Sequence, residues 1–188
     1  FDHYNIDTNK NLKIKNVCSR PFDTILIDKN GSCYACECTS WLPQSIGNLQ
    51  VQPLNDIIGS ATHKHLQESM TDSTYRYCNE KQCSYLRNQK EMLRWAGWKE
   101  STPTFSIKHL RLAIDDSCNL QCPSCRTKLI FHKDGSQFKK GIRLADKIND
   151  WIRSNLIFGE INLPLQVHIG SDGDPFASHV YRHFMEHT

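Results

Sequence analysis

Nine cysteines constrain this chain more than any other feature of its sequence. They form three groups whose members are close in sequence: Cys18, Cys33, Cys36 and Cys38; Cys78 and Cys83; Cys118, Cys122 and Cys125. A small secreted fold held by disulfides would have an even number of cysteines and usually a signal peptide. The first residues here are polar and lack the basic-then-apolar order of such a peptide. The grouped thiols therefore favour metal ligation in the cytoplasm over disulfide bonding.

Length and composition exclude several classes of protein. The 188 residues suffice for one sizeable core or for two small domains. No apolar run approaches the length of a membrane span, so no membrane partner is expected. The net charge is +3, and Lys and Arg are spread through the chain, so nucleic-acid binding is not indicated. Because the chain begins with Phe1 and stops at Thr188 within a predicted helix, we expect a fragment of a longer protein.

The first part of the sequence predicts a cysteine-rich α+β domain. Residues 22–28 and 32–36 are predicted to form a hairpin, because the Asn30-Gly31 pair between them tolerates the positive φ angles of a tight turn. Apolar periodicity over 54–70 indicates one or two helices, with a possible break at Gly59. Residues 89–98 are also predicted to be helical. Breakers and small polar residues over 99–104 predict a boundary between a domain at 1–98 and a second at 105–188.

The second part alternates between strand and helix patterns. Residues 107–114 and 163–169 are predicted strands, and residues 141–157 form an amphipathic helical pattern after a polar connection at 133–140. A turn over 170–175 leads into another helix over 176–185. This order predicts a right-handed βαβ unit with parallel strands, and hence an α/β fold.

A three-cysteine loop follows the first of these strands directly. Its spacing is C-x₃-C-x₂-C, from Cys118 through Cys122 to Cys125. A 4Fe–4S cube needs four ligands, so three thiolates would leave one iron open to a substrate or cofactor. A rival interpretation is a zinc site in which His132 joins the three cysteines, because soft thiolates also suit zinc.

This loop resembles the signature of the radical S-adenosylmethionine (SAM) superfamily, whose cysteines follow the first strand of a partial (β/α)6 TIM-like barrel. The resemblance implies that Cys118, Cys122 and Cys125 hold a 4Fe–4S cluster whose open iron chelates SAM. Reduction of the cluster then cleaves SAM and yields a 5′-deoxyadenosyl radical, which abstracts hydrogen from a substrate. Residues 105–188 would be the first, truncated part of that barrel.

A second match to the superfamily lies after the second predicted strand. Gly173 and Asp174 fall where the family has a Gly-Glu turn that holds the methionine amino group. Glycine allows the backbone to approach a ligand, and a carboxylate accepts hydrogen bonds from an ammonium group. The sequence departs from the family at Asp172, where glycine is common, and at Ser124, where an aromatic residue usually touches the adenine. We expect all four residues near the SAM site.

The N-terminal cysteines resemble a SPASM/twitch auxiliary iron–sulfur domain. The pattern C-x₁₂-G-x₄-C runs from Cys18 through Gly31 to Cys36, and a helix and a cysteine pair follow it. The resemblance covers Cys18 to about Leu86 and implies one auxiliary 4Fe–4S cluster on four thiolates: Cys18, Cys36, Cys78 and Cys83. Cys38 would share a face with Cys36 in an extended strand and could replace it, while the role of Cys33 stays open. Zinc bound by four cysteines is the alternative.

Together these resemblances imply a radical SAM enzyme that acts on an unidentified substrate, possibly a peptide. Such an enzyme needs an electron donor such as flavodoxin or ferredoxin. The fragment by itself is expected to be inactive. The alternative is a non-catalytic module that binds zinc or an iron–sulfur cluster for structure or for partner binding.

Overall fold

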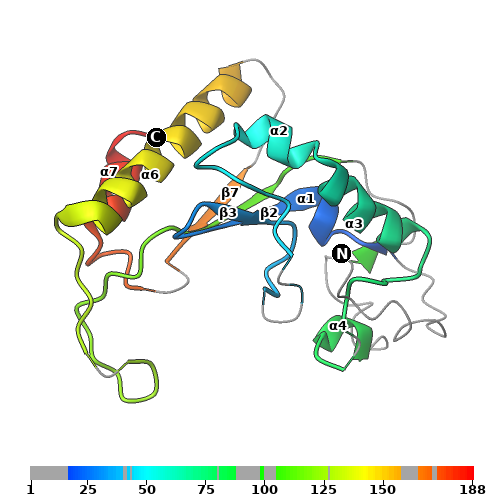
Figure 1. Ribbon diagram of the computed structural model, residues 1–188, viewed down its shortest axis with the longest axis horizontal. Helices are drawn as coiled ribbons and strands as arrows, with labels where there is room; N and C mark the ends of the chain where they lie inside the picture. The colour runs from blue at the N-terminus through cyan, green and yellow to red at the C-terminus, as the bar shows by residue number, and fades with distance from the viewer. Residues whose placement is uncertain are drawn as a thin grey trace.

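The computed structural model describes residues 17–39, 42, 44–79, 81–87, 98–99, 105–126, 128–157, 165–170 and 173–188. The fold is mixed α/β, with helices packed on a five-stranded sheet (Figure 1). The strands are β1 (Val17–Cys18), β2 (Thr24–Asp28), β3 (Ser32–Tyr34), β4 (Gly47–Asn48), β5 (Trp98–Lys99), β6 (His109–Ala113) and β7 (Gln166–Ile169). The helices are α1 (Arg20–Asp23), α2 (Leu54–Ile58), α3 (Ala61–Thr71), α4 (Ser84–Arg87), α6 (Gly135–Ile157) and α7 (His179–Glu186). None of the helices described is long and apolar enough to cross a membrane.

The predicted hairpin is confirmed, although its strands are shorter than the sequence pattern suggested. Strands β2 and β3 pair antiparallel, and residues 22 and 23, at the start of the predicted strand, belong to α1 instead. Gly31 has φ +77°, which favours glycine at that position of the turn. The Asp28 carboxylate caps the turn by accepting hydrogen bonds from the backbone nitrogens of Asn30 and Ser32, each at 2.8 Å. The break at Gly59 is confirmed too, because α2 ends at Ile58 and α3 begins at Ala61.

The parallel strands predicted around the second helix are also confirmed. The sheet order is β4-β3-β2-β6-β7, and β6 pairs in parallel with both β2 and β7. Helix α6 connects β6 to β7 and begins at Gly135, so the polar connection predicted over 133–140 was wrong from that residue onward. The polar first turns are helical because Phe138 already packs against the core while its exposed neighbours face water.

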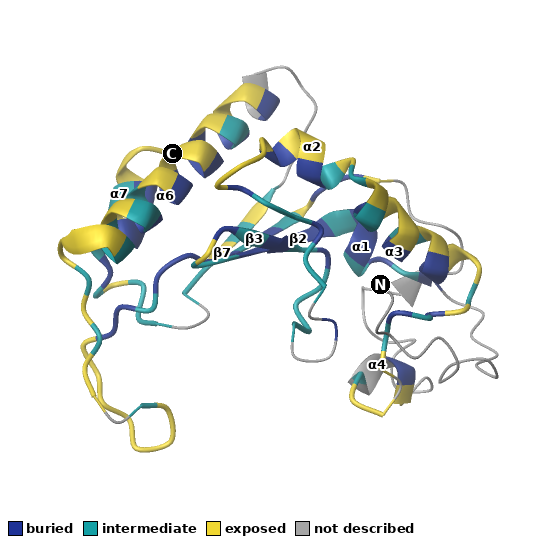
Figure 2. Cartoon of the chain, in the orientation of Figure 1, coloured by how far each residue is buried: buried dark blue, intermediate teal, exposed yellow. Residues whose placement is uncertain are grey.

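Most buried apolar side chains form one core between the sheet and its covering helices (Figure 2). Ile27 of β2 and Leu112 of β6 are buried together with Leu144 of α6 and Val180 of α7. Helices α6 and α7 approach closely at Gly141, where a Cβ atom would lie 2.8 Å from a Val180 methyl group. A second, smaller cluster holds Val17, Phe22, Met70, Tyr75 and Leu86, with Cys18, Cys78 and Cys83 packed against it.

Strands from both predicted domains share this sheet. Strand β2, from the first part of the chain, lies beside β6 of the second part over five register pairs from Thr24↔His109 to Asp28↔Ala113. The helix predicted over 89–98 falls outside the described residues except for Trp98, which begins strand β5. The predicted boundary over 99–104 also falls outside them except for Lys99. The division into two domains therefore stays a prediction, and the two parts contribute to one core.

Candidate metal centres

Five of the nine cysteines line one pocket beside the smaller apolar cluster. They come from β1, from the segment after β3 and from the residues between α3 and α4: Cys18, Cys36, Cys38, Cys78 and Cys83. The four residues predicted as auxiliary ligands are all among them. The structure thus brings together thiols that are up to 65 residues apart in the sequence.

Tyr75 fixes the positions of two of these cysteines. Its side chain is 1% exposed, and its hydroxyl accepts a hydrogen bond from the backbone nitrogen of Cys18 at 3.3 Å. Its backbone carbonyl accepts one from the nitrogen of Cys78 at 2.8 Å. Tyr75 has φ +46°, an unusual conformation for a residue with a Cβ, and it turns the chain after α3 back toward the pocket. Nothing in the local sequence pattern marked Tyr75 for this role.

Burial favours the protonated form of two of these thiols, Cys18 and Cys78. It raises the pKa of Cys18 to about 12 and that of Cys78 well above its usual value. Cys36 differs, because a hydrogen bond from Cys38 outweighs burial and lowers its pKa, while the same bond raises the pKa of Cys38. Metal binding at this pocket must therefore release several protons.

The spacing of the sulfur atoms bears on the kind of metal group that fits. Around one tetrahedral zinc ion, sulfurs bound at about 2.3 Å would lie about 3.8 Å apart. Among the residues that the structure describes, no three cysteine sulfurs lie within 4.8 Å of one another. In the described part of the chain these thiols are thus spaced more widely than the four ligands of one zinc ion would be. Five thiols line the pocket, and soft thiolates fit an iron–sulfur cluster as they also fit zinc.

The structure distinguishes the two cysteines whose roles the sequence left open, Cys33 and Cys38. Cys38 lines the pocket, and its backbone nitrogen lies 3.4 Å from the Cys36 sulfur, to which it donates. Cys33 lies instead in the main core, fully buried, with its thiol directed at the carbonyl of Gly31 at 3.6 Å. Cys33 is therefore a packing residue, whereas Cys38 is a fifth thiol at the pocket.

The three-cysteine loop extends away from the sheet at the carboxyl end of β6 (Figure 1). Cys118 is 9% exposed, and its backbone nitrogen donates to the carbonyl of Ile130 at 2.7 Å, which joins the two ends of the loop. Cys122 and Cys125 are exposed, and the nitrogen of Cys125 donates to the Cys122 carbonyl at 2.9 Å. Ser124 lies between them in the same exposed turn. The structure thus carries these three residues on one short, closed loop.

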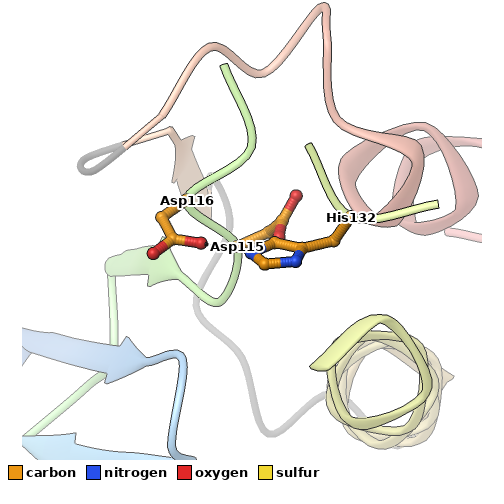
Figure 3. A group of neighbouring side chains, drawn as sticks. All are labelled: Asp115, Asp116 and His132. Atoms are coloured by element: carbon orange, nitrogen blue, oxygen red, sulfur yellow. Dashed lines mark hydrogen bonds and ion pairs between the residues drawn. The ribbon is translucent and has the colours of Figure 1, made fainter. Parts of the chain in front are cut away.

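Asp116 holds the base of this loop (Figure 3). One carboxylate oxygen accepts from the Lys29 ammonium group at 2.6 Å, and the other pairs with Nε2 of His132 at 2.8 Å. Burial alone would raise the pKa of Asp116, but these hydrogen bonds hold it below its usual range. Lys29 belongs to the β2–β3 turn and His132 follows the loop, so one carboxylate ties three segments together.

This contact bears on the zinc alternative at the three-cysteine loop. His132 was the candidate fourth ligand, and its Nε2 is directed at Asp116. Asp115, Asp116 and His132 form the one compact group of ligand-type side chains found among the described residues. The Lys29 ammonium group already neutralises Asp116, and the Asp115 carboxylate accepts from the Ser178 hydroxyl at 2.6 Å. We therefore interpret the group as a hydrogen-bonded support of the loop.

The turn after β7 packs directly against the same loop. The backbone nitrogen of Asp174 donates to the carbonyl of Ser117 at 2.9 Å. A Cβ atom on Gly173 would lie 2.4 Å from that carbonyl oxygen, so only glycine allows this approach. One Asp174 carboxylate oxygen accepts from the nitrogen of Phe176 at 3.0 Å. Asp172, also predicted for this site, lies outside the described residues.

Sequence reasoning did not predict the contacts that support the two centres. Asp116, Lys29 and His132 support the three-cysteine loop, and their pairing depends on strands β2 and β6 being neighbours in the sheet. Arg20 and Glu37 line the N-terminal pocket and form an ion pair at 3.1 Å. Its place two positions before Cys118 was the local signal available for Asp116.

Comparison with known families gives a match over part of the chain. Residues 18–84 match the family model of SPASM, an iron–sulfur cluster-binding domain. Comparison with curated proteins and with solved structures found no match. The SPASM resemblance of the N-terminal cysteines is thereby confirmed for this segment. A SPASM domain binds iron–sulfur clusters and is usually found in radical SAM enzymes.

Proposed function

We propose that this protein is a radical SAM enzyme, or the part of one that holds its catalytic cluster and one auxiliary cluster. One observation carries the proposal: the three-cysteine loop and the Gly173–Asp174 turn meet at the carboxyl ends of the neighbouring parallel strands β6 and β7. In α/β folds, this edge of the sheet is where active sites lie. The SPASM match on the same chain supports the proposal independently.

Cys118, Cys122 and Cys125 would hold the catalytic 4Fe–4S cluster. The loop fits such a group because it offers three thiols, while the nearest histidine, His132, is engaged by Asp116. One iron would then lack a protein ligand and be free to bind SAM. When bound and reduced, the cluster supplies the electron that cleaves SAM to a 5′-deoxyadenosyl radical.

The chain's own residues bind and orient around that group. Asp174 presents a carboxylate beside the loop, where it would accept hydrogen bonds from the methionine ammonium group. Gly173 allows the turn to lie against Ser117. Ser124 and Asp172 are proposed to lie near the nucleotide. Asp116 keeps the entry and exit of the loop together through its contacts with Lys29 and His132.

The auxiliary cluster would lie in the N-terminal pocket. Cys18, Cys78 and Cys83, together with either Cys36 or Cys38, would supply four thiolates and leave no iron open. A closed site of this kind serves electron transfer or structure. The two centres would lie toward opposite ends of β2, because residues that precede β2 line the pocket and Lys29, which follows β2, contacts Asp116 at the three-cysteine loop.

The remaining features of the proposal concern the whole protein. We propose that β6, α6, β7 and α7 are the first βα units of a partial TIM-like barrel, since β6 and β7 are parallel and α6 connects them. The substrate is proposed to be a peptide, because SPASM-bearing relatives often modify peptides. The electron donor is proposed to be a flavodoxin or a ferredoxin, and the protein to act in the cytoplasm.

Anaerobic reconstitution tests the proposal. We expect iron and sulfide to be taken up at two separable sites, one lost in a Cys118→Ala/Cys122→Ala/Cys125→Ala variant and the other lost in Cys18→Ala/Cys78→Ala. After reduction, the electron paramagnetic resonance signal of the first site should change when SAM is added. Uptake of zinc without iron would instead support a non-catalytic metal-binding module.

A further inference from the structure

We propose that the face of the sheet opposite helices α6 and α7 carries a binding site for a carboxylate group of the substrate. The site, here called the carboxylate site, consists of His109 and Arg111 of β6 and His168 of β7. The inference rests on the proposed function in assigning the bound group to a substrate, whereas the binding itself can be measured without a metal group. It adds a chemical class, substrates that carry a carboxylate, to the proposed reaction.

The two faces of β6 differ in character. Leu110 and Leu112 are 0% and 1% exposed and belong to the main core, which α6 and α7 cover (Figure 1). Alternate residues of a strand point to opposite faces, so His109 and Arg111 belong to the other face. His168 is exposed and is the register partner of Arg111 on β7, which places it on that same face. One guanidinium group and two imidazole rings therefore share the face that these helices leave open.

Arg111 is held by one end of its guanidinium group. Its Nε lies 2.8 Å from Oε1 of Glu37, and Nη1 of Arg20 lies 3.1 Å from the same oxygen, so Glu37 neutralises Arg111 only in part. To the residues that the structure describes, Nη1 and Nη2 of Arg111 make no hydrogen bond or ion pair. These two groups form a planar fork that can pair with a carboxylate through two parallel hydrogen bonds.

The two histidines place further donors beside that fork. Their ring centres lie 5.9 Å apart, and neither ring hydrogen-bonds to another residue in the described ranges of the chain. Burial lowers the pKa of His168, and positive neighbouring groups lower it further: Arg111, His109 and Arg20. The Glu37 carboxylate acts in the opposite direction without reversing the shift. The potential at His168 is therefore positive, as a site for an anion requires.

Charge favours a carboxylate over a phosphate. Glu37 lies against the site, and it would repel a doubly charged phosphate more strongly than a singly charged carboxylate. The planar fork of Arg111 also matches the planar carboxylate group in shape. A singly charged, planar anion is therefore the ligand that fits these groups best.

Location favours the substrate as the source of that carboxylate. In the proposed barrel this face is the interior, because the helices form the outer ring. Glu37 also lines the five-cysteine pocket, while β6 leads into the three-cysteine loop. His109 begins β6 and Arg111 is its central residue, whereas the proposed SAM site follows the carboxyl ends of the strands. A group held here would thus lie between the two candidate metal centres and apart from the turn proposed to hold SAM.

The test is a titration followed by the nuclear magnetic resonance signals of the histidine rings. The full 188-residue chain, labelled with ¹³C and ¹⁵N at histidine, is titrated with N-acetylglycine, the smallest peptide carboxylate. N-acetylglycinamide, which lacks the charge, and inorganic phosphate are titrated separately. The variants are Arg111→Gln and His168→Gln, and the control is Arg182→Gln, which removes the same charge from an exposed position on α7.

We expect N-acetylglycine to shift the signals of His109 and His168 and to raise the pKa of His168, because a bound carboxylate stabilises the imidazolium form. Arg111→Gln should weaken binding at least about tenfold, because it removes two charge-assisted hydrogen bonds. His168→Gln alters an exposed side chain, so it should fold normally and weaken binding about threefold, read from His109. Arg182→Gln should bind as the wild type does, and the amide should not bind.

Several outcomes would overturn the proposal. Equal affinity for the amide and the carboxylate, or wild-type affinity in both Arg111→Gln and His168→Gln, would refute the carboxylate site. Tighter binding of phosphate than of N-acetylglycine would assign the site to a phosphate group. Displacement of N-acetylglycine by SAM on the reconstituted protein would assign it to the SAM carboxylate. Carboxylate binding in a protein that takes up no iron would refute the proposed function, and with it the assignment to a substrate, but not the site.

Discussion

The contact between Gly173 and the carbonyl of Ser117 makes the Gly173→Ala substitution the most informative one in the chain. The added Cβ would lie 2.4 Å from that oxygen. Carbon and oxygen atoms in close contact usually lie about 3.3 Å apart, so the turn would have to move by about 1 Å. The hydrogen bond from the Asp174 nitrogen to the same carbonyl, 2.9 Å long, would be stretched beyond bonding distance.

The expected cost follows from these two losses. A hydrogen bond of this kind contributes about 1 kcal/mol, and forced overpacking costs about 1–3 kcal/mol. The free energy of unfolding of the metal-free protein should therefore fall by about 2–4 kcal/mol. Movement of the turn would relieve part of the overpacking and bring the loss toward the lower value. Since Asp174 moves with the turn, we also expect SAM to bind at least about tenfold more weakly, which corresponds to about 1.4 kcal/mol.

The assay pairs chemical denaturation with SAM affinity on the reconstituted protein. Gly59→Ala is the matched control, because its Cβ would have no neighbour nearer than 3.6 Å and its φ is −89°. That variant should keep wild-type SAM affinity and change stability by less than about 1 kcal/mol. The iron content of both variants should equal that of the wild type. Wild-type stability and wild-type SAM affinity in Gly173→Ala would refute the reasoning.

Three further predictions concern the thiols and the support of the loop. In denaturant titrations, Asp116→Asn should lower the unfolding free energy by about 1 kcal/mol and no more, because Lys29 is partly exposed and the ion pair is screened by water. The control Asp150→Asn should change it by less than about 0.5 kcal/mol, because the pair of Asp150 with Arg153 is largely exposed. Equal effects of the two substitutions would contradict a supporting role for Asp116. Burial raises the pKa of Cys33 from 9.0 to about 12, so the folded state keeps a proton that the unfolded chain loses near pH 9. Stability should therefore fall as the pH rises from about 9 toward 12, and more gently in Cys33→Ala; identical pH profiles would count against this. In a background lacking Cys118, Cys122 and Cys125, the single variants Cys36→Ser and Cys38→Ser should each retain iron in the N-terminal pocket, as measured by iron content. Only the double variant should lose this iron. Loss of iron in one single variant would instead identify that cysteine as the sole ligand of the two.

The elements that could be predicted from sequence are those with strong local signals. The Asn30-Gly31 turn, the break at Gly59 and the parallel strands β6 and β7 follow from glycine conformation and from the spacing of apolar residues. The start of α6 could not be placed, because its first turns are mostly polar and only Phe138 contacts the core. The SPASM resemblance likewise grouped Cys18 with Cys83, and the structure brings both to one pocket.

The residues that sequence reasoning could not supply act across the sheet. Lys29 reaches Asp116 only because β2 and β6 are neighbours, a pairing between segments that are 87 residues apart. Tyr75 supports Cys18 through its hydroxyl, again across a long separation in sequence. Cys33 and Cys38 are alike in sequence terms, and only burial separates the thiol in the core from the thiol in the pocket.

The binding of SAM to an iron that lacks a protein ligand is tested most directly by electron–nuclear double resonance on the reduced protein. SAM labelled with ¹⁵N in the methionine amino group is added to the wild type after removal of unbound iron. A nitrogen hyperfine coupling that is present with labelled SAM, and absent in the variant lacking the thiols of residues 118, 122 and 125, is the result we predict. A reduced cluster in the wild type that gives no such coupling with SAM in excess would contradict the account.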